Sequence, residues 1–208
     1  YGLDKPMAER YFTYISDAAH GDFGDSLKQR GRTVMDIIAT KFPVSAKLGG
    51  MAVVLALCVG VPLGVLAAYK RGTFIDSLFS VIATCGIAVP GFVICTLLLY
   101  VFGVKLQWLP TLGLKSAQSY IMPVIALASY PTSYIMRLMR SSMLDVLGQD
   151  YMRTAKAKGL SQKVSLFKHA LRNAILPVIT YVGPMLAYTL TGSFVTEKIF
   201  TIPGLGGE

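Results

Sequence analysis

The residues with the clearest chemical character lie in one basic stretch, 137–172. It contains eight Lys and Arg side chains, and only two acids, Asp145 and Asp150, oppose them. Within it, Ala155 and Gly159 are four positions apart, so on a helix they share a face where small residues would let another surface approach the backbone. Gly159 is also typical of the end of a short helix. The pattern predicts a loop that folds into a helix and docks on a partner; the alternative is a solvated basic loop bound to anionic lipid headgroups.

Side chains of the kinds used in catalysis are few and scattered. All three cysteines lie inside apolar runs, where a free thiol commonly behaves as a small buried hydrophobe (Cys58, Cys85 and Cys95). The two histidines, His20 and His169, are far apart and in different predicted loops. The run from Gly113 to Ser116 lacks the preceding glycine of a phosphate-binding loop. We therefore predict no disulfide framework, no metal site, no bound nucleotide or other cofactor in this chain, and no enzyme activity.

The composition places the chain in a membrane. Its 208 residues are 53% hydrophobic and only 15% charged, and the mean hydropathy is +0.55, which is too apolar for an ordinary soluble domain. Four runs contain no charged residue and have 22, 28, 21 and 24 residues: Leu48–Tyr69, Ser77–Val104, Ser116–Met136 and Asn173–Thr196. Because a helix needs about 20 residues to cross the bilayer core, the sequence predicts an all-α polytopic membrane protein with about four transmembrane helices.

Glycine and proline divide these predicted spans. Gly60 and Gly64 form a small-xxx-small pair suited to close helix packing, and Pro43 fits the first turn of the first span. Two further pairs interrupt apolar runs, Pro90-Gly91 and Gly183-Pro184. Irregular backbone at membrane depth is tolerated where it faces protein or a cavity, so we predict that these two pairs line a translocation path. The alternative is an ordinary proline kink in a tilted helix.

Charge also predicts how the chain is oriented. The two loops assigned to the cytoplasm, at 70–71 and 137–172, hold ten Lys and Arg, whereas the short loops assigned to the outside hold three. Cytoplasmic loops carry the excess of positive charge. Counting the seven Lys and Arg of residues 1–47 as well would equalise the two sides, but those cations are interleaved with acids and we discount them. We therefore divide the chain into an external arm, 1–47, and a transmembrane domain, 48–208, with its cytoplasmic docking loop at 137–172. The turn-rich stretch His20–Ser26 resembles the Gly-Asp-Phe-Gly-x-Ser stretch that follows the first span of peptide permeases on the external side, and the family resemblance settles the orientation. It implies a contact with an external binding protein; the alternative is a surface arm with no binding role.

The basic segment resembles the cytoplasmic loop of ABC-importer permeases. Arg153-Thr154-Ala155 stands at the Glu-Ala-Ala positions of that loop, Gly159 at its glycine, and His169-Ala170-Leu171-Arg172 at its Ile-x-Leu-Pro positions. The variant Arg-Thr-Ala-Lys-Ala-Lys-Gly-Leu, followed by His-Ala-Leu-Arg-Asn-Ala, is similar to the dipeptide/oligopeptide (peptide/nickel) branch of binding-protein-dependent permeases. The resemblance covers essentially the whole chain, which looks like the middle of a roughly six-helix ABC type I importer permease.

The resemblance implies a set of roles and partners. The ATPase-docking (coupling) helix would use seven residues: Arg153, Thr154, Ala155, Ala157, Gly159, Leu160 and His169. Cytoplasmic ATP-binding subunits would hold ATP and Mg²⁺, a second permease subunit would complete the path, and an external substrate-binding protein would deliver the substrate. The expected location is the bacterial inner (plasma) membrane, with several membrane passes.

The function predicted is therefore a permease subunit that forms a path for peptides and couples it to a cytoplasmic ATPase. The four predicted spans carry no charged residue, so an ion-coupled pump would lack its usual markers. Within the family, a nickel or glutathione importer is an alternative. Outside it, the alternatives are an ATP-independent secondary transporter or channel and a membrane anchor without a transport role.

Overall fold

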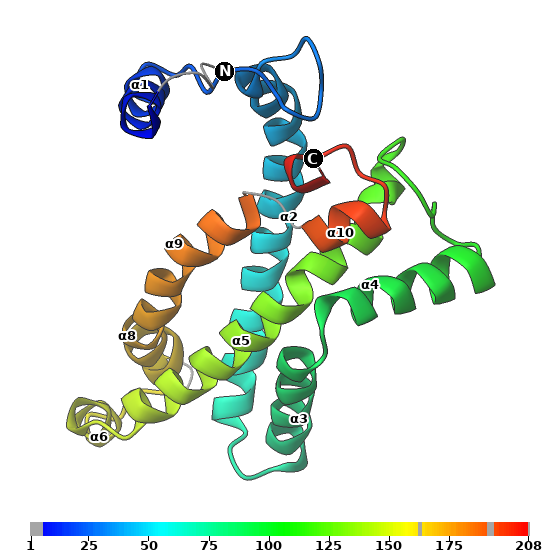
Figure 1. The fold of residues 1–208 in the computed structure, drawn as a ribbon. Helices are drawn as coiled ribbons and strands as arrows, with labels where there is room; N and C mark the ends of the chain where they lie inside the picture. Colours follow the sequence, from blue (N-terminus) through cyan, green and yellow to red (C-terminus); the bar gives the residue numbers. More distant parts are fainter. Residues whose placement is uncertain (1–5, 162–163, 191–193, 208) are drawn as a thin grey trace.

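The computed structural model describes residues 6–161, 164–190 and 194–207, and these residues are mainly helical (Figure 1). They contain no β-strand beyond one isolated antiparallel bridge between Asp25 and Thr33. In chain order the elements are α1 (Met7–Ala19), α2 (Val34–Tyr69), α3 (Phe74–Ala88), α4 (Gly91–Leu98), the π-helix η1 (Leu99–Lys105), the 3₁₀ helix η2 (Ala117–Tyr120), α5 (Ile121–Leu147), α6 (Asp150–Ala157), the π-helix η3 (Ser165–Ala170), α8 (Leu171–Ala174), α9 (Leu176–Leu190), α10 (Phe194–Ile199) and the 3₁₀ helix η4 (Leu205–Gly207).

The longest helix, α2, begins well before the apolar run that predicted it. A capping box starts the helix: Thr33 accepts a hydrogen bond from the Asp36 amide, and the Asp36 carboxylate accepts one from the Thr33 amide. The 36 residues of α2 then continue through Pro43 and Pro62. Pro43 is therefore inside the helix and not in its first turn, so that prediction was wrong. The helix also runs through residue 47, where the external arm was predicted to end.

Two stretches are long and apolar enough to cross a membrane, Val34–Tyr69 and Leu176–Ile199. A third is added if α3 and the α4–η1 pair, which are bent by 102° at their junction, form one span. The remaining predicted span corresponds to η2 and the first half of α5, a 27-residue helix whose middle, Ser129–Tyr134, is polar. The helical membrane fold is therefore confirmed, while length and composition distinguish two or three spans where the sequence predicted about four. Residues 191–193 of the last predicted span and residues 1–5 of the arm lie outside the described residues.

Close contact between α2 and α5 forms the centre of the bundle, where the two helices cross (Figure 1). A Cβ atom added to Gly60 would lie 2.9 Å from the Thr132 carbonyl oxygen, and one added to Gly64 would lie 2.6 Å from the Met136 carbonyl oxygen. Only glycine lets the backbones approach so closely. The predicted packing role of Gly60 and Gly64 is confirmed.

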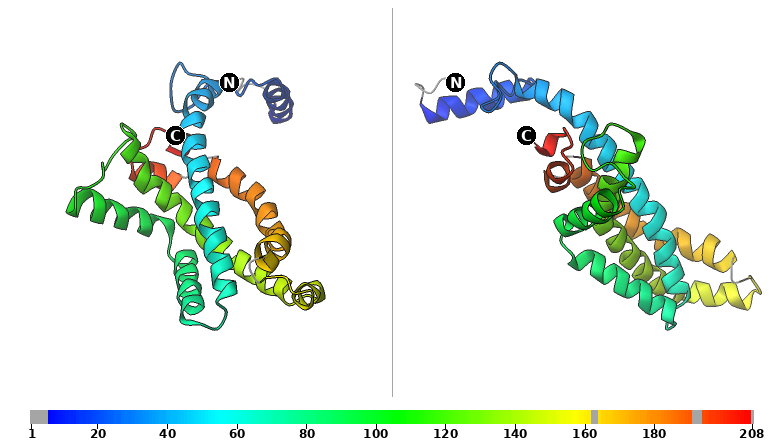
Figure 2. Two further views of the ribbon diagram at one scale, coloured as in Figure 1. Left: turned by 180° about the vertical axis from the view of Figure 1, so that it is seen from behind. Right: turned by 90° about the vertical axis from the view of Figure 1, so that its right-hand side faces the viewer.

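Buried apolar side chains form two clusters along this bundle. The inner cluster joins α2 and α5 to α6, η3, α8 and α9, and includes Met143, Met152, Leu166 and Ala170. The outer cluster joins α2, α4 and α5 to the chain around Phe200 and Ile202. Figures 1 and 2 show α6 and the α2–α3 turn at one end of the molecule, and both chain termini toward the other. The two basic loops assigned to the cytoplasm thus lie at the same end.

Candidate functional site

The predicted docking helix is formed by α6, and its inner face is attached to the rest of the chain. Met152 and Ala155 are buried in that face, with 1% and 8% of their surfaces exposed. Met152 belongs to the inner cluster, together with Met143 of α5 and Leu166 of η3. Since an isolated helix of eight residues is unstable in water, this burial is what holds α6 in place.

The outer face of α6 is open. Arg153, Thr154 and Ala157 are exposed, and Leu160 follows the helix with 39% of its surface accessible. On this face Arg153 pairs with Asp150 at 3.7 Å, and both side chains are so exposed that the pair contributes little stability. This face is free to meet a partner at the end of the molecule where the basic loops gather.

Gly159 ends α6 for a conformational reason. Its φ is +76°, in the left-handed region, and the Leu160 amide donates to the Ala155 carbonyl at 3.3 Å. This six-to-one hydrogen bond with a left-handed glycine is the Schellman ending of a helix. A Cβ atom added to Gly159 would meet nothing within 4 Å, so within the chain the glycine serves the turn and not a close contact.

The prediction that Ala155 and Gly159 share an outward face was wrong for Ala155, which faces the core. The structure instead brings Arg153, Thr154, Ala157 and Leu160 to the surface near Gly159. Their role in docking stays a prediction.

A hydrogen-bond link that the sequence did not predict joins α6 to the chain that follows. Asn173 of α8 donates through Nδ2 to the Tyr151 hydroxyl at 3.1 Å, and to the carbonyl oxygen of His169 at 3.2 Å. His169 is half-buried in η3 and takes part through its backbone, whereas we had predicted a docking role for it. The link connects the first turn of α6 to the helix that leads into α9.

The two proline–glycine pairs behave differently. At Pro90 the helix breaks: Val89 is extended, with φ −78° and ψ 123°, and α4 starts again at Gly91 after a bend of 102°. At Gly183-Pro184, by contrast, α9 continues as one helix from Leu176 to Leu190. All four residues are exposed in this chain. A break therefore forms at one of the two predicted positions, and the lining of a path by either stays a prediction.

Charged side chains lie closer to the spans than the sequence predicted, because the helices continue beyond the uncharged runs. Arg140 of α5 donates to both carboxylate oxygens of Asp76 in the first turn of α3, at 2.6 and 2.9 Å, and the Gly72 amide donates to the same carboxylate at 3.0 Å. Such bidentate pairing is the strong form of this interaction. Glu197, in α10, is also buried. The four predicted runs contain no charged residue, but the helices that include these runs extend further and do carry charged side chains.

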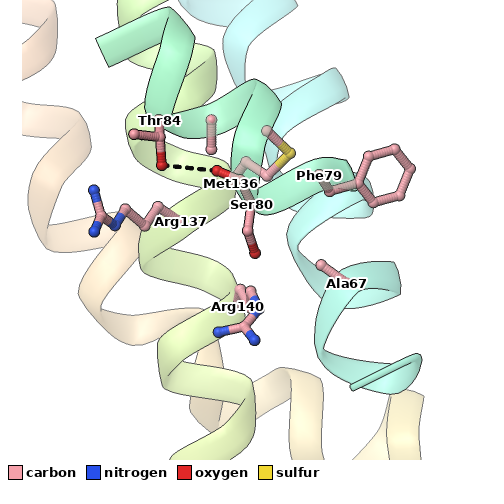
Figure 3. A pocket seen from close by; sticks show the side chains of 8 residues that line it. Ala67, Phe79, Ser80, Thr84, Met136, Arg137 and Arg140 are labelled. Atoms are coloured by element: carbon pink, nitrogen blue, oxygen red, sulfur yellow. Dashed lines mark hydrogen bonds between the residues drawn. The ribbon is translucent and has the colours of Figure 1, made fainter. Parts of the chain in front are cut away.

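A small pocket lies beside the Asp76–Arg140 pair, between α2, α3 and α5, with a volume of about 150 Å³. Figure 3 shows Arg137 and Arg140 extending from neighbouring turns of α5, with their guanidinium groups pointing in different directions. On α3, the Thr84 hydroxyl donates to the Ser80 carbonyl at 2.8 Å. The pocket is too small to hold a peptide.

A wider groove lies on the predicted external arm, with a volume of about 1020 Å³. It is lined by the face of α1 that carries Tyr11 and Tyr14, and by the loop around Phe23 and Asp25. That loop is the turn-rich stretch assigned to a binding-protein contact. The groove gives the stretch a concave, partly aromatic surface.

Comparison with known proteins decides the family. Residues 60–207 match the model of the family described as binding-protein-dependent transport system inner membrane component. The chain belongs to this family.

Individual relatives agree with that assignment. The chain is 47% identical over 206 residues to the dipeptide transport system permease protein DppB of Bacillus subtilis (strain 168), covering 99% of this chain and 67% of the relative. It is 44% identical over 208 residues to the oligopeptide transport system permease protein OppB of Salmonella typhimurium, covering 99% of this chain and 68% of the relative. The resemblance inferred from the basic segment is confirmed.

One solved structure shares the fold. A crystal structure described as an amino acid ABC transporter with histidines superposes with a TM-score of 0.59 at 16% identity, covering 93% of this chain and 79% of that chain. The chain is therefore an all-helical ABC transport permease, a multi-pass protein of the inner membrane.

Proposed function

We propose that this chain is the permease subunit of an importer for peptides and that α6 is the element through which a cytoplasmic ATPase drives it. Relatives named as dipeptide and oligopeptide permeases, at 47% and 44% identity, support the substrate class. The observation that carries the coupling role is the two-sided character of α6, which is buried on one face and open on the other. A partner bound to the open face would push against a helix that cannot move without its neighbours.

The connections of α6 give the route of that motion. Met152 joins α6 to the inner cluster shared with α5, and Asn173 joins Tyr151 to the start of α8, which leads into α9. Displacing α6 would therefore tilt α5 and α9 together, as in rigid-body switching of packed helices. Because Arg140 and Asp76 tie α3 to α5, the same displacement would carry α3 along with α5.

The partners follow from this mechanism. ATP and Mg²⁺ would be bound by cytoplasmic ATP-binding subunits, and this chain would itself carry no cofactor and catalyse no reaction. A second permease subunit would face this one across the path, and the break at Pro90 is the element best suited to line it. An external binding protein would approach from the side of α1, where the groove beside Phe23 and Tyr14 offers a surface for contact.

A bulky substitution on the open face of α6 tests the proposal. Ala157 is the best position, because it is exposed and inside the helix, whereas a large residue at Gly159 would strain the left-handed turn whatever binds there. In the complete permease with its partner subunits, Ala157→Trp should insert normally, lose co-purification of the ATPase, and lose peptide-stimulated ATP hydrolysis.

The matched control is Ala19→Trp, at an exposed alanine of α1 at the opposite end of the molecule. It should leave ATPase binding unchanged. If Ala157→Trp retains both ATPase binding and stimulated hydrolysis, the docking role of α6 is wrong and the basic segment is better explained by contact with lipid. If stimulation in the unmodified complex follows nickel or glutathione instead of peptides, the substrate class is wrong while the docking role stands.

A further inference from the structure

A buried carboxyl group sits at the end of the bundle opposite α6. Glu197 of α10 has 1% of its surface exposed. Its Oε1 accepts a hydrogen bond of 2.7 Å from the hydroxyl of Ser45 on α2. The same hydroxyl oxygen accepts a bond of 2.8 Å from the Leu205 amide. Ser45 thus joins α2 to both ends of residues 194–207, called here the outer segment.

The outer segment folds closely around this carboxyl group. The Ile202 amide donates to the Glu197 carbonyl at 2.8 Å, which turns the chain back toward α10. A Cβ atom added to Gly204 would lie 2.5 Å from Glu197 Oε2, and one added to Gly206 would lie 3.2 Å from it. The glycines therefore pack directly against the carboxyl group and leave little room beside it.

The second carboxyl oxygen has no hydrogen-bond partner. Among the described residues, Glu197 Oε2 is buried and neither donates nor accepts a hydrogen bond. A buried polar atom that has lost its water without gaining a partner opposes the conformation that buries it, and more strongly when it is charged. The unpartnered carboxyl oxygen therefore favours opening of the outer segment.

Apolar burial favours the closed arrangement. Phe200 and Ile202 are 2% and 4% exposed and belong to the outer cluster with Cys95 of α4. The Phe200 carbonyl also accepts a bond of 2.8 Å from the Gly113 amide, in the loop that precedes η2. Cys95 is itself buried, with its sulfur 3.7 Å from the Thr196 hydroxyl of α10. The outer segment thus covers α4, and lifting it would expose Cys95.

We propose that the outer segment is a cover that opens at the outer end of the bundle, and that Glu197 is the positioning residue that keeps its closed state only marginally stable. Within residues 6–161, 164–190 and 194–207, Ser45 is the one hydrogen-bond donor to the carboxyl group in the closed state, and water replaces it when the cover opens. For its consequence in transport the inference rests on the proposed function, because an external opening is useful to a protein that receives substrate from outside.

Cys95 provides the measurement. In the complete permease with its partner subunits, every cysteine except Cys95 is replaced by serine, including Cys58 and Cys85. The rate at which a water-soluble maleimide labels Cys95 is then measured. Ser45→Ala removes the hydroxyl that donates to Glu197 and accepts from the Leu205 amide, and labelling should become about tenfold faster. Glu197→Met replaces the carboxyl group by an apolar chain of similar size, and labelling should become slower than in the parent, as when buried charge is replaced by apolar groups.

The labelling rate should rise in Ser45→Ala and fall in Glu197→Met. If Glu197 only held the segment closed, the rate would rise in both variants. The double variant Ser45→Ala with Glu197→Met should label more slowly than Ser45→Ala alone, because no unpaired carboxyl group remains and only the Leu205 amide has lost its partner. Ser77→Ala, at an exposed serine of α3, is the matched control and should label like the parent. Glu197→Met also serves if Ser45→Ala does not assemble.

Faster labelling in both single variants would show that Glu197 simply holds the segment closed, and equal labelling in all variants would show that the pair does not control opening. Either result overturns the inference. Peptide-stimulated ATP hydrolysis is measured on the same samples. If labelling changes as expected while no peptide stimulates the parent, the cover is supported and the proposed substrate class fails instead.

Discussion

Replacing Met152 by alanine should detach α6 from the body of the permease. Met152 is 1% exposed and lies, with Ala155, on the buried face of a helix of eight residues. Truncating a buried methionine to alanine costs about 2–5 kcal/mol, and the lower end applies here because a short helix at the end of the bundle can settle into the vacated space. A loss of about 2 kcal/mol reduces the ratio of docked to undocked α6 by roughly thirtyfold.

Two assays on the complete permease measure this change. Hydrogen exchange at the amides of Lys158 and Leu160, which close the end of α6 in the structure, should become faster by a similar factor. Peptide-stimulated ATP hydrolysis should fall, because a mobile α6 no longer transmits force to α5 and α9. Binding of the ATPase should be reduced less than its coupling, since the outer face of α6 is unchanged.

Met143→Ala is the matched control, because Met143 is equally buried in the same cluster but belongs to α5. It should lower the overall stability of the permease while leaving exchange at the end of α6 slower than in the Met152 variant. The reasoning is refuted if Met152→Ala leaves exchange and coupling at parent values. It is also refuted if the two variants have the same stability and lose the same fraction of peptide-stimulated ATP hydrolysis. Met152 would then have no special role in transmitting motion from α6 to α5 and α9.

Three further substitutions test the packing of the helices. Gly64→Val should separate α2 from α5, because even a Cβ atom would lie 2.6 Å from the Met136 carbonyl oxygen. The melting temperature should fall by an amount that corresponds to about 2–3 kcal/mol of unfolding free energy. An unchanged melting temperature would contradict the contact. Asp76→Asn leaves the partly exposed Arg140 without its carboxylate and should cost about 2 kcal/mol in denaturant unfolding, and a second change, Arg140→Gln, should recover part of that loss. Gly159→Ala should destabilise the end of α6 by about 1 kcal/mol, because the φ of Gly159 is +76°. Gly159→Asn should have a stability closer to that of the parent. Hydrogen exchange at the Leu160 amide measures the difference.

Patterns that depend on neighbours along the helix were predicted well from the sequence. The uncharged runs indicated a helical membrane protein, and the spacing of Gly60 and Gly64 predicted a close-packing face, which in the structure contacts α5. The left-handed glycine at the end of α6 was likewise expected, since a helix ending requires a residue that tolerates positive φ. In each case the requirement is local, so the sequence alone contains it.

Features that depend on packing were not predicted. Ala155 faces the core because Met152, one turn earlier, is the larger apolar residue and sets which side of α6 turns inward. The capping box of Thr33 and Asp36 was a sequence signal for an earlier start of α2, and the presence of Pro43 obscured it. The pairing of Asp76 with Arg140 joins residues 64 positions apart, which no local pattern reports.

The two proline–glycine pairs show why local composition was not enough. At Pro90 the residue before the proline adopts the extended conformation that proline favours in its predecessor, and the chain turns by 102°. At Pro184 the preceding residue is Gly183, which has no side chain to clash with the proline ring, and α9 continues. In addition, α4 packs on α5 and α10 after its turn, so tertiary contacts support the break at Pro90.

The charged residues at the ends of the helices suggest how one end of the molecule differs from the other. At the end that holds α6, the Asp76 carboxylate receives three hydrogen bonds, two of them from Arg140, so α3 and α5 are fixed to each other. At the other end, Glu197 receives one bond, from Ser45, and its second oxygen receives none from the residues that the structure describes. A satisfied buried charge resists separation, whereas an unsatisfied one favours hydration. Force applied at α6 would therefore move α3 and α5 as one unit, and the resulting movement would be released at the outer segment, where the closed state is weakest.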